Sequence, residues 1–207
     1  MPGKIAAGHH TLADWDFESG ALRRSLSADY FISAPTSVKI TSPGGTIYES
    51  FLCRIPGSLA LAQGEWRTWQ RFLTASHRPC IFRNQAALGS SNMLNTYWIG
   101  VFGGNINLGR FLAGAGSARD SFSFPTPADV WVHWRFFWYN GLTPGLVEAL
   151  CVDVYTEIAG EWVSAGPTLY DTANTWKDSG INRCGAWSNP RPPNSVYYDD
   201  SEVWGPV

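Results

Sequence analysis

Charged residues are scarce in this chain. Asp, Glu, Lys and Arg together make up 15% of the 207 residues, against roughly 25% in an average soluble domain. The formal net charge is only -2, and no run rich in Lys or Arg occurs. A broad electrostatic surface for nucleic acid therefore has little support in the sequence, and we expect no nucleic-acid partner.

Long apolar segments are missing as well. Residues 84–109 form the longest stretch without charge, but Asn, Ser and Gly interrupt it throughout. It does not provide the roughly 20 apolar residues of a membrane span. Near the N-terminus, Ile5-Ala6-Ala7 is far shorter than the core of a secretion signal. We expect a protein with no membrane span and no cleavable signal peptide, located in a virion or on an extracellular surface.

Cysteine is sparse, and its spacing is uninformative. The four cysteines are Cys53, Cys80, Cys151 and Cys184, and none forms a Cys-x-x-Cys pair. Each lies in an apolar, strand-like stretch, which is typical of buried free thiols. Two disulfides, with three possible connectivities, and a zinc site are the alternatives.

Aromatic residues and turn-forming residues are abundant instead. Aromatics make up 14% of the chain, with 11 Trp, and there are 21 Gly and 13 Pro. Few charges, many aromatics and frequent turns favour short strands over helices. Turn chemistry such as Ser42-Pro43-Gly44-Gly45 and Asn140-Gly141 separates the apolar runs.

The apolar runs predict about a dozen strands at regular spacing. They cover residues 12–18, 37–41, 47–54, 66–73, 80–83, 97–102, 106–111, 122–124, 130–139, 147–158, 162–163, 181–187 and 196–204. This pattern predicts an all-β fold, a two-sheet antiparallel jelly-roll sandwich. We expect residues 12–207 to form a single domain and residues 1–11 to form an N-terminal tail.

Residues 130–139 show strand alternation over their whole length. One face carries Val132, Trp134, Phe136 and Trp138 and is a predicted core face. The other face is amphipathic, a candidate for a partly exposed aromatic surface. It carries Trp131, His133, Arg135, Phe137 and Tyr139.

Four short motifs follow one another along the chain. They are Trp15-Asp16-Phe17-Glu18, Trp131-x-His133-x-Arg135, Gly160-Glu161-Trp162-Val163 and Tyr197-Tyr198-Asp199-Asp200-Ser201-Glu202-Val203. Together they resemble the concanavalin A-like jelly-roll superfamily, in the style of its laminin G-like and MAM-type modules. The resemblance implies a jelly-roll sandwich whose first and last strands pair. It implies no single function, because this fold serves lectins, adhesion modules, glycanases and lyases.

The same resemblance implies a structural calcium ion, which several such modules hold where the first and last strands meet. Asp16, Glu18, Asp199 and Asp200 would be its ligands here, because strand pairing would bring these carboxylates together. Calcium takes six to eight oxygen ligands, often carboxylates. The alternative is that Asp199 and Asp200 point to opposite faces and that one of them hydrogen-bonds a turn.

The acids needed for glucan hydrolysis are not spaced correctly. A glucanase of this superfamily carries alternating acids on one strand, which set an acid and a nucleophile about 5 Å apart. Asp153 and Glu157 are four residues apart, about 13 Å along a strand, and Glu148 points to the opposite face. No Gly-x-Ser-x-Gly motif for a nucleophilic serine occurs either.

A polysaccharide lyase is a further possibility, because this chemistry needs a Tyr/His pair beside Arg. His133, Arg135 and Tyr139 share one strand face, but the other short motifs of such lyases are missing. We therefore expect no catalytic residues and no enzymatic activity. A polysaccharide lyase or a glycoside hydrolase remains the enzymatic alternative.

The aromatic surplus fits a binding protein, because sugars stack on flat rings and protein interfaces favour Trp, Tyr and Arg. The candidate ligand-binding residues are Trp66, Trp69, Arg71, Trp176 and Trp187. The alternative for each Trp is a place in the sandwich core. We expect a structural or adhesion subunit of a virion (phage tail or capsid surface) or of another extracellular assembly, with protein subunits as partners. The alternative is a lectin-like module that binds a surface glycan.

Overall fold

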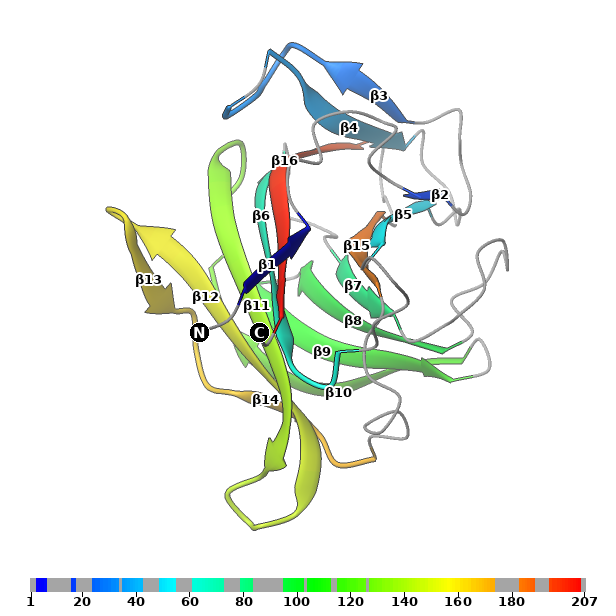
Figure 1. The fold of residues 1–207 in the computed structure, drawn as a ribbon, viewed down its shortest axis with the longest axis vertical. Coiled ribbons are helices and arrows are strands. Elements are labelled where there is room, and N and C mark those ends of the chain that lie inside the picture. Colours follow the sequence, from blue (N-terminus) through cyan, green and yellow to red (C-terminus); the bar gives the residue numbers. More distant parts are fainter. Residues whose placement is uncertain are drawn as a thin grey trace.

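In the part of the chain that the structure describes, all regular elements are strands. The structure, a computed structural model, describes residues 3–6, 16–17, 24–33, 35–42, 49–54, 61–72, 79–83, 95–102, 104–112, 115–125, 127–173, 183–188 and 194–205. No helix occurs in these residues, and so none that is long and apolar enough to cross a membrane. The strands form two antiparallel sheets that face each other (Figure 1).

One sheet has nine strands, in the order β13-β12-β11-β6-β16-β4-β3, with β1 pairing with β16 and β14 with β12. Their bounds are β1 Gly3–Ala6, β3 Arg24–Ser27, β4 Ser37–Ser42, β6 Gly64–Phe72, β11 Trp131–Leu142, β12 Glu148–Ile158, β13 Glu161–Ser164, β14 Leu169–Asp171 and β16 Asn194–Gly205.

The other sheet has seven strands, in the order β10-β9-β8-β7-β15-β5-β2. Their bounds are β2 Asp16–Phe17, β5 Glu49–Arg54, β7 Pro79–Arg83, β8 Asn95–Phe102, β9 Asn105–Leu112, β10 Ala115–Ser123 and β15 Arg183–Ser188. The predicted fold class, an antiparallel two-sheet sandwich, is confirmed.

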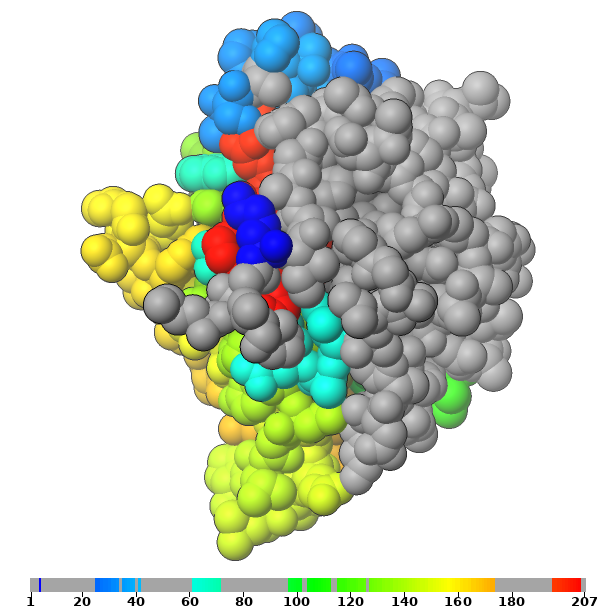
Figure 2. Space-filling model, viewed as in Figure 1, coloured from blue at the N-terminus to red at the C-terminus, as the bar shows by residue number. Residues whose placement is uncertain are grey.

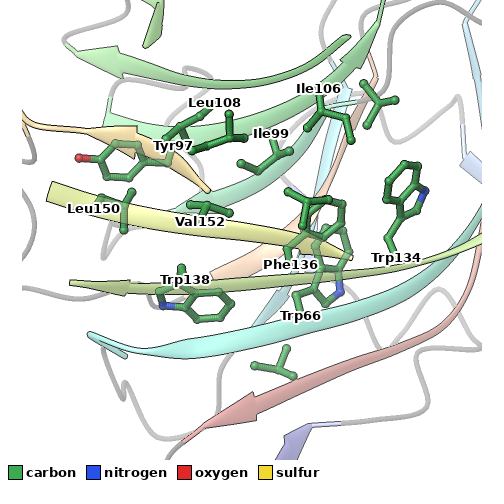
Figure 3. Close-up of a cluster of buried hydrophobic side chains, with 14 of the residues drawn as sticks. Trp66, Tyr97, Ile99, Ile106, Leu108, Trp134, Phe136, Trp138, Leu150 and Val152 are labelled. Carbon is green, nitrogen blue, oxygen red and sulfur yellow. The ribbon is translucent and has the colours of Figure 1, made fainter. Parts of the chain in front are cut away.

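The core lies between the two sheets and is rich in large aromatic rings. Along β11, Trp134, Phe136 and Trp138 are fully buried, as the alternation predicts. Trp66 of β6 joins them, and β8 and β9 contribute aliphatic side chains from the facing sheet (Figure 3). The Trp138 indole N–H donates a hydrogen bond to the Leu61 carbonyl at 3.0 Å, so the ring is satisfied although it is buried.

Several strands begin or end elsewhere than predicted. Residues 3–6, placed in a tail, form β1 beside β16, so that part of the prediction is wrong. The short strands 24–27 and 169–171 were not predicted, because each is too short to show alternation. The exposed edge strand β10 begins at residue 115 rather than 122, because its first half carries little apolar signal.

Asn140-Gly141 does not end β11, which continues to Leu142. The chain reverses after it, where Leu146 adopts a left-handed φ of 61°. A Cβ on Gly141 would lie 2.9 Å from the Cys151 Sγ, so this glycine provides close packing within the hairpin rather than a turn.

The predicted pairing of the opening motif with the last strand is wrong. Asp16 and Phe17 form β2, which pairs with β5 in the seven-stranded sheet. The last strand, β16, lies in the nine-stranded sheet, between β6 on one side and β4 and β1 on the other. An earlier segment, residues 3–6, therefore occupies the place beside β16 that the resemblance implied for residues 14–18.

Cys151 is a buried free thiol, as predicted. Burial raises the pKa of its thiol above the usual value, which keeps it in the unreactive protonated form. The side chains of Cys53, Cys80 and Cys184 lie outside the described part of the structure.

Candidate functional site

The face of the nine-stranded sheet that points away from the core, called here the outer face, carries a dense set of aromatic and charged side chains. The antiparallel register aligns them in rows that run across the strands. One row contains Trp162, Glu157, His133, Trp69 and Asp199. The next row contains Ser164, Tyr155, Arg135, Arg67 and Glu202.

The outer face extends over several strands. β12 and β13 lie on one side of it and β3 and β4 on the other, with β11, β6 and β16 between them (Figure 1). In the space-filling view, β12 and β13 project in yellow at the left and β3 and β4 in blue at the top (Figure 2). The rows therefore run across the middle of a wide sheet, where the strands hold each side chain at a fixed spacing.

The rings in the first row form a continuous stack. His133 stacks on Trp69, with ring centroids 4.4 Å apart and planes inclined by 12°. Its other neighbour is Trp162, at 4.6 Å and 54°. The Arg67 guanidinium lies 5.8 Å from the Trp162 ring and 4.3 Å from the Trp204 ring. Trp69, Trp162 and Trp204 are half-buried, so this part of the outer face exposes indole surface while the rings and the guanidinium group support one another.

His133 is held between these rings by a hydrogen bond. Its Nδ1 lies 2.5 Å from the Glu157 Oε2. Burial lowers the pKa of His133 below its usual value, and Arg67 acts in the same direction, whereas Glu157 and Glu202 raise it. The net lowering means that His133 is neutral at neutral pH, with Nδ1–H as the donor to Glu157.

The lowered pKa of His133 predicts a loss of stability in mild acid. Below pH about 6.5 the unfolded chain protonates this histidine, whereas the folded protein resists protonation until the pH reaches its lower pKa. The free energy of unfolding should therefore fall between these two pKa values, by at most about 1.4 kcal/mol per pH unit. Urea denaturation of wild type and His133→Gln from pH 7.5 to 5 measures the difference. Identical pH profiles would contradict the prediction.

A buried carboxylate lies beneath the second row. Glu65 is only 1% exposed although its side chain is on the outer face. Its Oε2 accepts hydrogen bonds from Arg135, whose Nε and Nη2 both lie at 2.6 Å, and its Oε1 forms an ion pair with Arg67. One carboxylate thus binds two guanidinium groups, which leaves the cluster of three side chains with one positive charge.

Toward the rims of the outer face, the remaining cations are also paired with acids. Arg71 lies 2.9 Å from Asp129. Lys39 lies 3.2 Å from Asp29, and Lys4 lies 2.7 Å from Glu202. Each of these cations also lies over an aromatic ring, with Tyr30 below Arg71, Tyr197 below Lys39 and Trp204 below Lys4.

The predicted ligand-binding residues do not lie together in the structure. Trp69 and Arg71 lie on the outer face, while Trp66 is fully buried in the core, where no ligand can reach it. The alternation along β6 already places these side chains on opposite faces, a signal that the prediction did not use. Trp176 lies outside the described residues, and Trp187 belongs to β15 of the other sheet, with its side chain outside the described part.

The carboxylates of the predicted metal site are used differently. Asp199 is buried, and its Oδ2 accepts backbone N–H groups from Ile32 at 2.7 Å and Ser33 at 3.4 Å. Asp200 accepts the Ser33 hydroxyl at 2.5 Å. Both acids therefore bind the loop at residues 32–33, whereas the alternative interpretation had only one of them bind a turn.

The strand pairing that suggested a calcium site does not occur in the structure. Asp16 lies in β2 of the opposite sheet, and Glu18 lies outside the described residues. Within the described residues, no three His, Cys, Asp or Glu side chains are grouped so as to hold a metal ion. Calcium binding stays a prediction.

The strand β16 contains a bulge between Asp199 and Glu202, where Asp200 has a left-handed φ of 46°. Before the bulge, the odd-numbered residue Asp199 points to the outer face. After it, the even-numbered residues Glu202 and Trp204 do so, while Ser201 turns inward and hydrogen-bonds Thr68 at 2.7 Å. The bulge therefore brings Trp204 to the outer face, where its ring lies beside Arg67, which no periodic pattern in the sequence predicts.

Comparison with known proteins shows which solved structures share this architecture. No protein-family profile and no curated protein sequence matches the chain. Solved structures match over nearly its whole length. The marine PL-14 alginate lyase from Aplysia kurodai has a TM-score of 0.66 at 11% identity, covering 99% of this chain and 100% of the lyase.

Two further structures contain carbohydrate-binding proteins. The carbohydrate-binding module CBM66 from Bacillus subtilis has a TM-score of 0.50 at 11% identity, covering 94% of this chain and 93% of its own. The exoplasmic/lumenal domain of VIP36, in its Ca2+/Man3GlcNAc-bound form, has a TM-score of 0.56 at 12% identity, covering 100% and 91%.

The chain has the concanavalin A-like jelly-roll fold. The resemblance in the sequence is thereby confirmed for the fold. Concanavalin A-like jelly rolls include both enzymes and binding modules among these neighbours, so the chemistry of the outer face has to decide between them.

The two outer-face tyrosines of β11 and β12 are poor bases in this jelly roll. Burial raises the pKa of Tyr139 to about 12, with Asp153 and Cys151 acting in the same direction. Burial and Asp153 also raise the pKa of Tyr155. Both phenols therefore stay protonated at neutral pH and can donate or accept hydrogen bonds.

Proposed function

We propose that this protein is a non-catalytic glycan-binding module and that its ligand lies across the outer face of the nine-stranded sheet. The observation that supports this most directly is the half-buried stack of Trp69, His133 and Trp162. Proteins of the same fold include a carbohydrate-binding module and the exoplasmic/lumenal domain of VIP36 bound to Man3GlcNAc. A sugar offers apolar C–H faces and hydroxyl groups, which match aromatic surface and polar side chains respectively.

The polar groups around the stack are suited to hydroxyl recognition. Arg67, Arg135 and Tyr155 occupy the neighbouring row, two residues along their strands from the row of the rings. Because cross-strand pairing and ion pairs hold these side chains in place, little conformational entropy is lost when a ligand binds. A rigid, already assembled surface of this kind fits a binding module.

Replacing Trp69 with alanine should weaken glycan binding by about tenfold or more, equivalent to roughly 1.4 kcal/mol. The substitution removes one ring of the stack and frees His133 from its neighbour. Trp162→Ala should act in the same direction. A glycan array identifies the ligand, and isothermal titration calorimetry with the best ligand measures the change in affinity.

Phe111→Ala is the matched control, because Phe111 is a half-buried aromatic residue on β9 of the other sheet. It should leave the affinity unchanged. If both Trp variants bind as tightly as wild type, or if only the control loses affinity, the ligand does not lie on the outer face.

A subunit role in a virion or another extracellular assembly, with protein partners, stays a prediction. It differs from glycan binding in a measurable way, because an assembly subunit should sediment as a defined oligomer or with a particle. A glycan array without hits, combined with such an oligomer, would favour the assembly over the glycan-binding module.

A further inference from the structure

We infer that the outer face selects neutral glycans over anionic ones and that the buried carboxylate of Glu65 sets this selectivity. The inference rests on the proposed function, since it concerns the ligand class of the same surface. It starts from the arginines that would otherwise attract an anionic sugar.

Arg67 and Arg135 lie at the centre of the outer face, beside the ring stack. Free guanidinium groups in this position would bind a carboxylate or sulfate of an acidic sugar through paired hydrogen bonds. Here both groups already bind the same carboxylate, that of Glu65. Since Glu65 is 1% exposed, solvent does not weaken these ion pairs as it would at the surface.

The other cations of the outer face are also paired with carboxylates and so are less available to an anionic ligand. Each cation whose side chain the structure describes on this face has an acidic partner. The pairs are Lys4–Glu202, Lys39–Asp29, Arg67–Glu65, Arg71–Asp129 and Arg135–Glu65.

Further carboxylates lie on the same face. Glu157 binds His133, which is neutral, and Asp153 accepts a hydrogen bond from the Thr168 hydroxyl at 2.6 Å. The five pairs contain five cations but four acids, because Glu65 serves two arginines, so these two carboxylates bring the acids to six against five cations. The described side chains therefore give the face a slight excess of negative charge, which repels an anionic polymer.

An acidic sugar would have to displace Glu65 from two arginines, leaving a buried carboxylate without its partners, which is strongly unfavourable. A neutral sugar does not face this cost. It needs only donors and acceptors at the margins of the ion pairs, together with the indole surface of the stack. The outer face thus distinguishes neutral from anionic sugars by charge and not by the shape of the binding surface.

Affinity electrophoresis of the full chain tests the inference. The probes are neutral polysaccharides (laminarin, xyloglucan and mannan) and anionic ones (alginate, polygalacturonate and heparin). Wild type should be retarded by a neutral polymer and not by the anionic ones, and high salt should leave its binding unchanged. Glu65→Gln, which keeps the shape and removes the charge, should gain at least tenfold in affinity for an anionic polymer, and high salt should abolish this gain.

Arg135→Gln is the matched control, since it is also a change from charge to amide in the same cluster. It leaves Glu65 charged and should produce no gain for anionic polymers. A folded Glu65→Gln protein without any gain overturns the inference. If Glu65→Gln does not fold, the wild-type protein provides the test. A wild-type protein that binds acidic polymers as tightly as neutral ones overturns the inference but is consistent with the proposed function. A wild type that binds no glycan of either class overturns both.

Discussion

Replacing Trp138 with alanine should lower the free energy of unfolding by about 3–5 kcal/mol. The indole is fully buried between the sheets, and it closes over Gly64, where a Cβ would lie 2.5 Å from the Trp138 Cζ2. Alanine would leave a large cavity that this close packing prevents from collapsing. It would also leave the Leu61 carbonyl without the indole N–H that it accepts.

Thermal and urea denaturation measure this loss. At 2–4 °C per kcal/mol for a chain of this size, the melting temperature should fall by roughly 6–20 °C. Trp162→Ala provides the control, because it is the same chemical change on a half-buried residue of the outer face. If both variants lose the same stability, Trp138 does not have the role in the core that we assign to it.

Replacing Arg110 with methionine should have a comparable effect, about 3–5 kcal/mol, because it takes the nearer and more deeply buried of two cations from a buried carboxylate. Arg110 of β9 lies 3.2 Å from Asp171 of β14, and both side chains are almost completely buried. Arg119 of β10 is the only other cation paired with Asp171 among the described residues, at 3.5 Å. The Asp171 Oδ1 also accepts the Ala173 backbone N–H at 3.1 Å. The ion pair thus connects β14 to β9, the strand next to the edge strand β10 of the other sheet.

A double-mutant cycle measures the interaction energy between Arg110 and Asp171 separately from the cost of removing each side chain. Removing both charges, in Arg110→Met with Asp171→Leu, should cost less than the sum of the two single changes, because no charge is then left buried alone. Lys4→Met breaks the exposed Lys4–Glu202 pair, with Lys4 44% exposed, and should cost about 1 kcal/mol or less. A loss for Arg110→Met as small as that for Lys4→Met would contradict the buried role of the pair.

Much of the fold was predictable from local patterns, because alternation and turn chemistry act over a few residues. The pattern of residues 130–139 gave both faces of β11 correctly, since each second side chain must point the same way. Short or polar strands such as 24–27 and 169–171 carry no such pattern. Their positions depend on pairing with β4 and β12, which lie outside these short segments.

The candidate site was less accessible to sequence analysis, because its contacts are distant along the chain. Trp69 was found as an aromatic residue, but its stack needs His133 and Trp162 on two other strands. Glu65 gave no signal at all. Its role appears only when the register of β6 and β11 places Arg135 beside it, 70 residues away.

The bulge in β16 has a consequence for how this surface could have arisen. Asp200, in its left-handed conformation, is one residue more on β16 than the facing stretch of β6 requires. Deleting Asp200 would close the bulge and leave Glu202 opposite Arg67, with Trp204 still on the outer face and Val203 still in the core. A strand without this residue would present the same side chains, so the insertion of one codon could create the bulge, and with it the contact of Asp200 with Ser33, without disturbing either face of the sheet.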